Sequence, residues 1–124
     1  MKQAINNINT YIKDNTTLVV AVSGGPDSMA LLDILLKQKQ KKNLNIVVAH
    51  VNHKLRQESD AEEIMVKNYC GKNHLTCEIL TIDNYKKGNI ENQARTKRYV
   101  FFEEIVKKRK ASYLLTAHHG DDLI

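Results

Sequence analysis

Four short apolar runs, separated by polar stretches, are spaced along the chain at residues 18–22, 46–51, 77–82 and 112–117. The first two runs are rich in β-branched residues and almost continuously apolar. Strands that are covered on both faces have this character, whereas strands with one wet face alternate apolar and polar residues. The pattern therefore predicts four strands, the first two of them buried on both sides.

Helix-like segments with spaced apolar residues lie between these runs. They span residues 26–41, 60–73 and 90–110, and their apolar positions are Met29, Leu32, Leu35 and Leu36, then Ile64 and Tyr69, then Tyr99, Phe102 and Val106. Pro26 suits a first helical turn, and Ser59 or Asp60 is the expected N-cap of the second helix. A short helix at the start of the chain is expected to carry Ile5, Ile8, Tyr11 and Ile12 on its apolar face.

This alternation of strands and helices predicts the fold class. Strands that alternate with helices form a parallel sheet between helical layers, so we expect a three-layer α/β domain with about four parallel strands. Right-handed crossovers place the loops that follow the strands along one edge of the sheet, where such folds bind ligands. The loops after Val22, Val51 and Ala117 are therefore the candidates for a functional site.

Composition narrows the class of protein further. The 124 residues are 42% apolar and 27% charged, which fits one small globular domain. No apolar run reaches the roughly 20 residues that span a bilayer, and the first residues lack the apolar stretch of a signal peptide. A cytoplasmic location without a membrane partner is therefore expected. The net charge of +5 suits a polyanionic partner, although the basic runs at residues 37–42 and 107–110 fall at predicted helix C-termini, where cations complement the helix dipole.

The clearest chemical signal is the loop that joins the first strand to the first long helix. It consists of Ser23, Gly24, Gly25, Pro26, Asp27 and Ser28. Two glycines let backbone N–H groups approach a phosphate, the helix N-terminus adds partial positive charge, and the serine hydroxyls can donate to phosphate oxygens. Asp27 suits such a site if Mg²⁺ lies between its carboxylate and the phosphate. A tight turn capped by a serine is the structural alternative, and the loop matches neither a Walker A nor a Rossmann motif.

Polar residues also follow the second strand. His50 and His53 are three residues apart, but no further zinc ligands are obvious nearby. A polar lining of a substrate cleft is therefore favoured, with Arg56 pairing with a phosphate or carboxylate, and a solvated loop is the alternative. Cys70 and Cys77 form no C-x-x-C pair and are expected to be reduced thiols in or near the core.

Two further groups belong on the same edge of the sheet. Arg95 lies on the helical face of Tyr99 and Phe102, and a helix between parallel strands begins at their carboxyl ends, so Arg95 is expected there with Glu91 as its partner. An ordinary surface ion pair is the alternative. The last strand is followed by His118, Asp121 and Asp122, and adjacent carboxylates can hold Mg²⁺ or a cationic substrate, unless Asp121 only caps a helix.

Together these motifs resemble a known family. Residues 23–28 are similar to the phosphate loop of the N-type ATP pyrophosphatases, the PP-loop family, whose fold is adenine nucleotide alpha-hydrolase-like. Three later motifs resemble, in order, signatures of tRNA(Ile)-lysidine synthases. They are H-V-N-H-x-L-R at residues 50–56 with S-D at 59–60, E-x-x-A-R-x-x-R-Y at residues 91–99, and H-H-x-D-D at residues 118–122.

The resemblance implies a ligase that uses ATP and Mg²⁺ to adenylate the wobble cytidine of the CAU-anticodon isoleucine tRNA. L-lysine then displaces AMP and forms lysidine, and pyrophosphate is the other product. A thiolase-type PP-loop enzyme acting on tRNA is one alternative, although such enzymes generally carry C-x-x-C pairs. A nucleotide-binding module without turnover is another, and a homodimer is compatible with the sequence.

The resemblance also implies roles for single residues. The loop from Ser23 to Ser28 would bind the pyrophosphate end of ATP, with Asp27 on Mg²⁺. The other implied contacts are the backbone of Ala21, His50 and Val51 near adenine and ribose, Arg95 on the nucleotide, His53 and Arg56 in the substrate cleft, and His118, Asp121 and Asp122 on the nucleotide and lysine side. Because sequences of the family continue beyond the last motif, residues 1–124 are expected to be an N-terminal ATP-binding domain that is incomplete at its C-terminus. The parts that the family is expected to use for tRNA recognition lie beyond these residues. Such a piece is expected to bind nucleotide weakly and to make no lysidine by itself.

Overall fold

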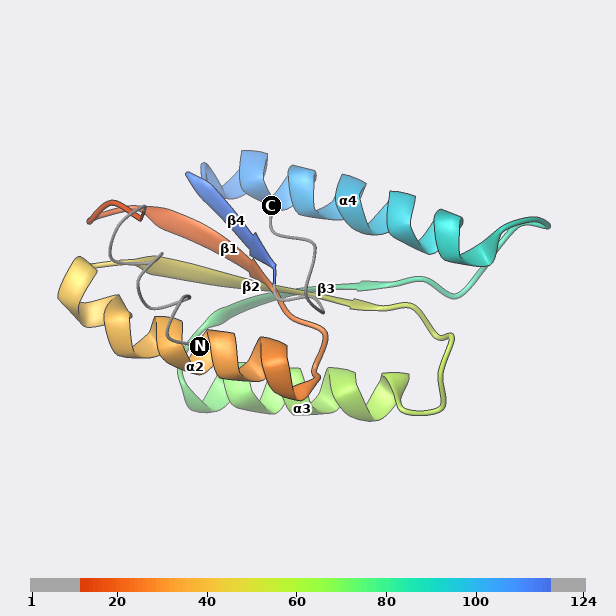
Figure 1. The fold of residues 1–124 in the computed structure, drawn as a ribbon, viewed down its shortest axis with the longest axis horizontal. Helices are drawn as coiled ribbons and strands as arrows, with labels where there is room; N and C mark the ends of the chain where they lie inside the picture. The colour runs from red at the N-terminus through yellow and green to blue at the C-terminus, as the bar shows by residue number, and fades with distance from the viewer. Residues whose placement is uncertain (1–11, 117–124) are drawn as a thin grey trace.

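The computed structural model describes residues 12–116, which form four strands and three helices (Figure 1). In chain order they are β1 (Thr17–Ala21), α2 (Pro26–Lys42), β2 (Asn45–Asn52), α3 (Ser59–Lys72), β3 (Thr76–Thr81), α4 (Ile90–Arg109) and β4 (Tyr113–Thr116). All seven elements predicted within this range are confirmed, and their ends differ from the prediction by one residue at most. The helix expected at the start of the chain lies outside the described residues apart from Ile12, which is buried.

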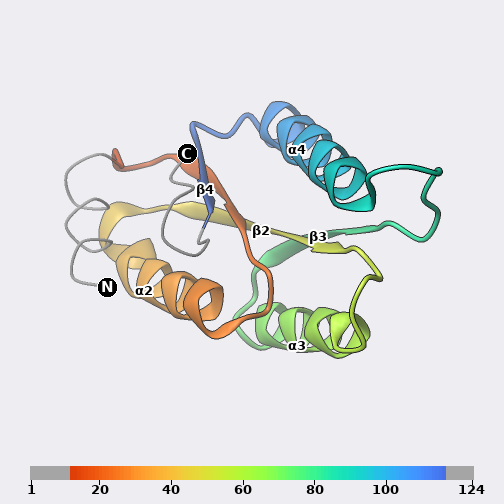
Figure 2. The same ribbon diagram turned by 45° about the vertical axis from the view of Figure 1, so that its right-hand side comes forward.

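The sheet is parallel throughout and has the strand order β3-β2-β1-β4. Helices α2 and α3 cover one face of it, and α4 covers the other (Figures 1 and 2). The chain first winds outward from β1 to β3 and then returns to the other side of β1, so the winding reverses beside β1. The predicted three-layer α/β fold is confirmed, and its carboxyl edge carries the loops before α2, α3 and α4.

Alternate residues of the two central strands belong to different cores. Leu18 and Val20 of β1 pack with residues of α2 and α3, whereas Val19 and Ala21 pack with residues of α4. All four side chains are buried, which confirms the prediction of a strand covered on both faces. The helices contribute mainly Leu32, Leu35, Val66 and Cys70 on one side and Phe102 and Ile105 on the other. Each fully buried aliphatic side chain contributes roughly 1.5–3 kcal/mol to folding.

The two apolar positions predicted in α3 differ in their surroundings. Tyr69 packs against the core, whereas Ile64 is 58% exposed, and Val66 and Cys70 are the buried residues. Ile64, Met65 and Val66 are consecutive, so spacing alone could not select the buried side. Packing against β2 and β3 selects it. Within residues 12–116, no helix is long and apolar enough to cross a membrane.

The N-terminus of α3 also differs from the prediction. Glu58 occupies the N-cap position, and neither Ser59 nor Asp60 caps the helix. Ser59 is instead the first helical residue, and its hydroxyl accepts a hydrogen bond from the Arg56 N–H at 3.3 Å. Asp60 is occupied by the side chains of Asn52 and Lys54. These side chains are therefore used to hold the loop before α3 rather than the first turn of the helix.

All three helices end in the same way before the next strand. Asn43, His74 and Lys110 adopt the left-handed conformation, with φ of 52°, 56° and 54°. The following N–H groups bond five residues back, from Leu44 to Lys39, from Leu75 to Cys70 and from Ala111 to Val106, each at 2.9 Å. These are Schellman motifs, which satisfy the last helical carbonyls. The last turns of α2 and α4 carry three cations each, as the helix-dipole interpretation of the basic runs predicts.

Candidate functional site

The loop between β1 and α2 is closed by its own serines. The Ser28 side chain is 1% exposed, and its hydroxyl accepts the Ser23 N–H at 3.0 Å and donates to the Gly25 carbonyl at 3.2 Å. The Ser23 hydroxyl accepts the Gly25 N–H at 3.2 Å. Ser28 thus stabilises the loop from inside, whereas Ser23 is exposed at its surface.

Gly24 lets this loop lie directly against α3. Its φ of +85° is in the region that favours glycine. A Cβ at this position would be 2.9 Å from the Cβ of Glu62, closer than real side chains approach. The close contact brings the phosphate loop and the first turn of α3 together, and only glycine fits between them.

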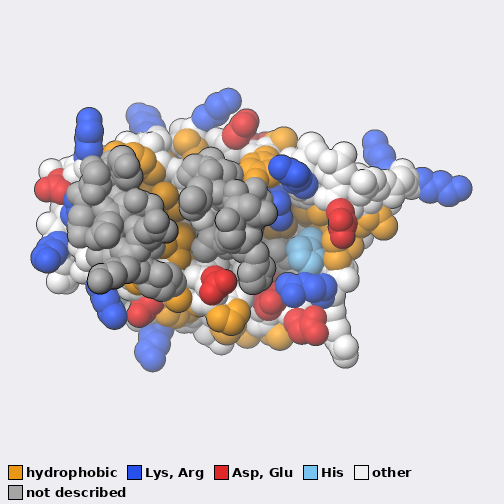
Figure 3. Space-filling model, viewed as in Figure 1, with side chains coloured by type: hydrophobic (Ala, Val, Ile, Leu, Met, Phe, Trp, Pro, Cys, Tyr) orange, Lys and Arg blue, Asp and Glu red, His pale blue; other side chains and the backbone are white. Residues whose placement is uncertain are grey.

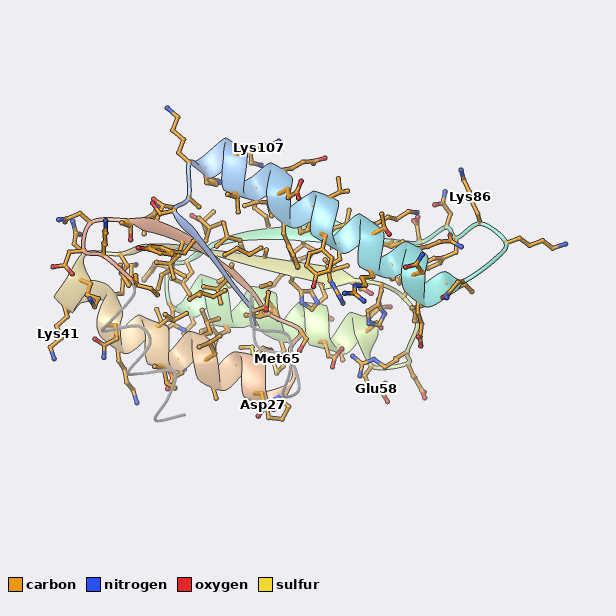
Figure 4. All side chains as sticks on the ribbon, turned by 45° about the horizontal axis from the view of Figure 1, so that its top comes forward. Asp27, Lys41, Glu58, Met65, Lys86 and Lys107 are labelled. Atoms are coloured by element: carbon orange, nitrogen blue, oxygen red, sulfur yellow. The ribbon has the colours of Figure 1, made fainter. Side chains whose placement is uncertain are left out.

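The N-terminus of α2 has no side-chain cap. Gly25 is the N-cap residue and Pro26 is the first helical residue. No side chain caps this end by accepting a hydrogen bond from its N–H groups. Such an end can bind an anion, because its N–H groups and the helix dipole attract negative charge. Ser23 and Ser28 hold the turn before α2, as the alternative interpretation requires, but neither of them caps the helix. Asp27 is exposed in the first turn of α2 (Figure 4), beside the place that an anion would take.

The end of β2 is held by two buried polar side chains. His50 Nδ1 donates to the Val22 carbonyl at 2.8 Å, which ties β2 to the start of the phosphate loop. The Asn52 amide donates to Asp60 at 2.9 Å and to Glu63 at 3.0 Å, and its oxygen accepts the Lys54 N–H at 3.1 Å. These bonds connect β1, β2 and α3 at the carboxyl edge of the sheet.

The next residues present a histidine between two ion pairs. Lys54 meets Asp60 and Arg56 meets Glu62, each at 2.6 Å. His53 Nδ1 accepts the Leu55 N–H at 3.1 Å, so in a neutral ring the proton is on Nε2. Burial and the nearby Arg56 guanidinium lower the pKa of His53 below its ordinary value of 6.5, which favours that neutral ring.

A pocket of about 140 Å³ opens beside the phosphate loop. Among its walls are five residues that the sequence singled out, namely Ala21, Ser23, Val51, His53 and Arg56. The other residues of the pocket have no ligand role predicted from the sequence; they are Val22, Ser59, Glu62, Arg98 and Phe102. On this end of the molecule a histidine is visible at the surface among acidic and basic side chains (Figure 3).

Two arginines of α4 flank the same aromatic ring. The guanidinium carbons of Arg95 and Arg98 lie 5.8 Å and 5.5 Å from the ring centroid of Tyr99. Arg98 lines the pocket, and its buried Nε has no partner among the described residues. Arg95 is exposed one turn earlier and does not line the pocket. The expected ion pair between Arg95 and Glu91 is absent from the described part of the chain.

Arg98 could have been found from the sequence, because it lies four residues before Phe102 and so on the same helical face. Glu62 gave no such signal, since its role depends on the packing of the glycine loop. Within residues 12–116 no three His, Cys, Asp or Glu side chains gather where they could hold a metal ion. His118, Asp121 and Asp122 lie outside the described residues.

The cysteines are in the core, as expected. Cys70 is buried in α3, and Cys77 of β3 is half-buried and packs against the same cluster. A hydrogen bond between the thiols raises the pKa of Cys70, and burial raises it further. Both thiols are free, and they lie away from the pocket.

Comparison with known proteins finds similar sequences of lysidine synthases. The chain is 49% identical over 113 residues to a tRNA(Ile)-lysidine synthase of Enterococcus faecalis, covering 90% of this chain and 24% of that protein. It is 42% identical over 130 residues to that of Bacillus subtilis, covering 100% and 27% of the two chains. For the Mycoplasmopsis pulmonis protein the identity is 44% over 107 residues, and the shares are 86% and 35%. The chain thus spans about a quarter to a third of the length of these curated relatives.

A solved structure and a family profile complete the comparison. A U34-tRNA thiolase from Methanococcus maripaludis, solved with its iron–sulfur cluster, has a TM-score of 0.80. The likeness covers 94% of this chain and 44% of that one at 16% identity, so it shows the shared fold alone. The profile of the PP-loop domain matches residues 1–124. Because this match covers all 124 residues and the structure has the glycine loop and parallel sheet described above, the chain belongs to the PP-loop domain family.

Proposed function

We propose that this chain is the ATP-binding domain of an enzyme that modifies tRNA by forming lysidine. The proposed reaction adenylates the wobble cytidine of isoleucine tRNA with a CAU anticodon and releases pyrophosphate. L-lysine then attacks, and AMP leaves. The observation that carries the proposal is the uncapped N-terminus of α2 beside the pocket, in a chain whose relatives named above are lysidine synthases.

Two parts of the site are proposed to bind different portions of the nucleotide. The pocket of about 140 Å³ is below the roughly 300 Å³ of a whole small-molecule site, so it suits one portion of ATP. The phosphates then extend over the loop at residues 23–28, toward the N-terminus of α2. Arg98 lines the pocket, so its guanidinium is the candidate cationic donor to a ligand oxygen there.

Charge neutralisation is the main chemical task of this site. The base oxygen of cytidine attacks the α-phosphate as pyrophosphate leaves, and it later departs as part of AMP, which is a good leaving group. Catalysis therefore needs alignment of the tRNA base with the α-phosphate and cations around the phosphates. We assign the phosphate contacts to residues 23–28, with Ser23 as the exposed hydroxyl, and the neighbouring cationic contacts to Arg56, Arg95 and Arg98. We assign Asp27 as the carboxylate ligand of Mg²⁺, with phosphate oxygens and water as the other ligands, since Mg²⁺ usually binds through one or two carboxylates. His118, Asp121 and Asp122 are proposed to line the lysine side.

The test is a hybrid protein in which residues 1–124 replace the aligned segment of the Bacillus subtilis relative. The hybrid, the intact relative and the 124-residue chain are each incubated with tRNA, labelled lysine and Mg-ATP. We expect ATP-dependent labelling of tRNA by the hybrid and the relative, with AMP and pyrophosphate as products. The 124-residue chain alone is expected to bind ATP weakly and to label nothing.

The alternatives give different results. A hybrid that binds ATP and makes AMP but transfers no lysine, beside an active relative, overturns lysidine formation and favours another PP-loop reaction on tRNA. Binding of ATP without AMP formation favours a nucleotide-binding module. Labelling by the 124-residue chain alone contradicts its expected inactivity.

A further inference from the structure

The cations at the carboxyl edge of the sheet fall into two groups. In the loop before α3, the charges of Lys54 and Arg56 are each matched by a carboxylate at 2.6 Å. In the loop before α4, neither Lys86 nor Lys87 forms an ion pair with any residue of the described chain. Basic side chains project at the tip where this loop lies (Figures 1 and 3), and Lys86 points away from the ribbon (Figure 4). Lys86 and Lys87 therefore add positive charge at this edge that no described carboxylate pairs with, beside the exposed Arg95 of α4.

The Gln93 side chain holds this loop through both backbone polar groups of one residue. The Gln93 amide oxygen accepts the Lys86 N–H, and its nitrogen donates to the Lys86 carbonyl, both at 2.8 Å. Asn89 caps α4 by accepting the Asn92 N–H at 3.0 Å. The backbone of Lys86 is thus fixed at two atoms, while its ammonium group stays in solvent. A cation presented in this way loses little loop entropy when it binds a ligand.

The same loop is fastened to the wall of the pocket. The Tyr85 hydroxyl donates to the His53 carbonyl at 2.6 Å, and His53 lines the pocket. Lys97 donates to the Asn84 carbonyl at 3.1 Å and lies 5.6 Å from the centre of the Tyr85 ring. Tyr85 therefore sets the position of Lys86 and Lys87 relative to the pocket.

We propose that Lys86 and Lys87 form a docking arm that binds backbone phosphates of the RNA substrate beside the pocket. The inference rests on the proposed function for the identity of the polyanion. The arm itself is supported by two ammonium groups without ion pairs in the described chain, on a fixed loop that is bonded to the pocket wall. Phosphate contacts of this kind position a nucleic acid without reading its sequence.

The test measures binding of tRNA to the 124-residue chain as a function of salt. Lys86→Glu/Lys87→Glu removes the arm, and Lys41→Glu/Lys107→Glu is the matched control, with the same charge change on helices of the other end (Figure 4). We expect the arm variant to bind tRNA at least tenfold more weakly at low salt. Its log–log salt slope should fall by about one for each lost phosphate contact. Gln93→Leu keeps the charges but frees the loop, and it should weaken binding by a smaller factor.

The outcomes separate the arm from the proposed reaction. Equal weakening in the arm and control variants, or no weakening in the arm variant, overturns the docking arm while lysidine formation by the hybrid stands. Absence of tRNA binding to the unaltered chain at low salt also overturns it. If the arm variant alone loses tRNA binding but the hybrid makes no lysidine, the arm stands and the reaction fails. ATP binding should be the same in the unaltered chain and both double variants, which confirms that they fold.

Discussion

The two edges of the sheet are built differently. At the amino edge, helices return to strands through connections of two or three residues, all closed by backbone hydrogen bonds of one kind. At the carboxyl edge, strands lead to helices through connections of four to eight residues, held largely by side chains such as Ser28, Asn52 and Gln93. The amino edge is therefore set by local chain geometry. The carboxyl edge depends on individual residues, and a single substitution there should change both stability and binding.

The largest effect is expected at Gly24. Gly24→Ala introduces a Cβ at a positive φ and 2.9 Å from the Glu62 Cβ, so the phosphate loop must move away from α3. We expect at least a tenfold loss of ATP affinity and a loss of about 1–3 kcal/mol in the free energy of unfolding. Ligand-detected NMR and urea unfolding measure the two quantities.

Gly71→Ala is the matched control, because a Cβ at this helical position meets no atom within 4 Å. It should stabilise the chain by about 0.5–1 kcal/mol and leave ATP binding unchanged. Equal ATP affinity in the two glycine variants contradicts the argument from close packing.

Asn52 should give the next largest change. Asn52→Leu removes three hydrogen bonds of a buried amide and leaves the Lys54 N–H, Asp60 and Glu63 without it. We expect a loss of about 2–3 kcal/mol in the free energy of unfolding, measured by urea denaturation. Asn68→Leu, on the exposed side of α3, should change stability by less than about 0.5 kcal/mol. A similar small change at both positions contradicts a structural role for the Asn52 network.

The amino edge should respond in the opposite direction. His74→Gly and Lys110→Gly place glycine in left-handed positions that other residues occupy at a cost. Each should raise the free energy of unfolding by about 1 kcal/mol, and the two effects should add because the residues are in separate turns. Thermal unfolding of the single and double variants checks this, with ATP binding as the control. Destabilisation by either glycine contradicts the left-handed conformation.

The smallest predicted effect is a change in the pKa of His53. Burial and Arg56 lower it, so Arg56→Gln should move it back toward 6.5. A histidine whose pKa falls on folding binds its proton first in the unfolded chain, so stability should decrease as the pH falls below about 6.5. An NMR titration measures the shift, and His53→Gln identifies the resonance. A pKa above 6.5 in the unaltered chain contradicts this account.

The elements were predictable because their signals are local. Two apolar β-branched runs with polar breaks define β1 and β2, and Pro26 after two glycines defines the start of α2. The buried side of α3 was not predictable, since Ile64 and Val66 are equally apolar and only contact with β2 and β3 distinguishes them. The three left-handed helix ends were missed because none carries the glycine that marks them.

The candidate site also has a part that was predictable and a part that was not. The phosphate loop and His53 each belong to a short sequence motif, and they lie close together because their strands are neighbours in the sheet. Glu62 and Gln93 act through residues of other loops, at Gly24 and Lys86, and no pattern in the sequence connects those pairs. Their roles are visible only once the loops are packed.

The position of β1 has a consequence for how the chain is made. β1 pairs with β2 on one side and with β4 on the other. Leu18 is paired with Tyr113, although almost the whole described chain separates the two residues in sequence. During synthesis, β1, β2 and β3 can assemble with α2 and α3 as soon as they leave the ribosome. The other side of β1 must wait for the last strand, with its backbone donors and acceptors open to any extended segment nearby. A nascent chain halted before Tyr113 should therefore be a substrate for chaperones that hold exposed strands.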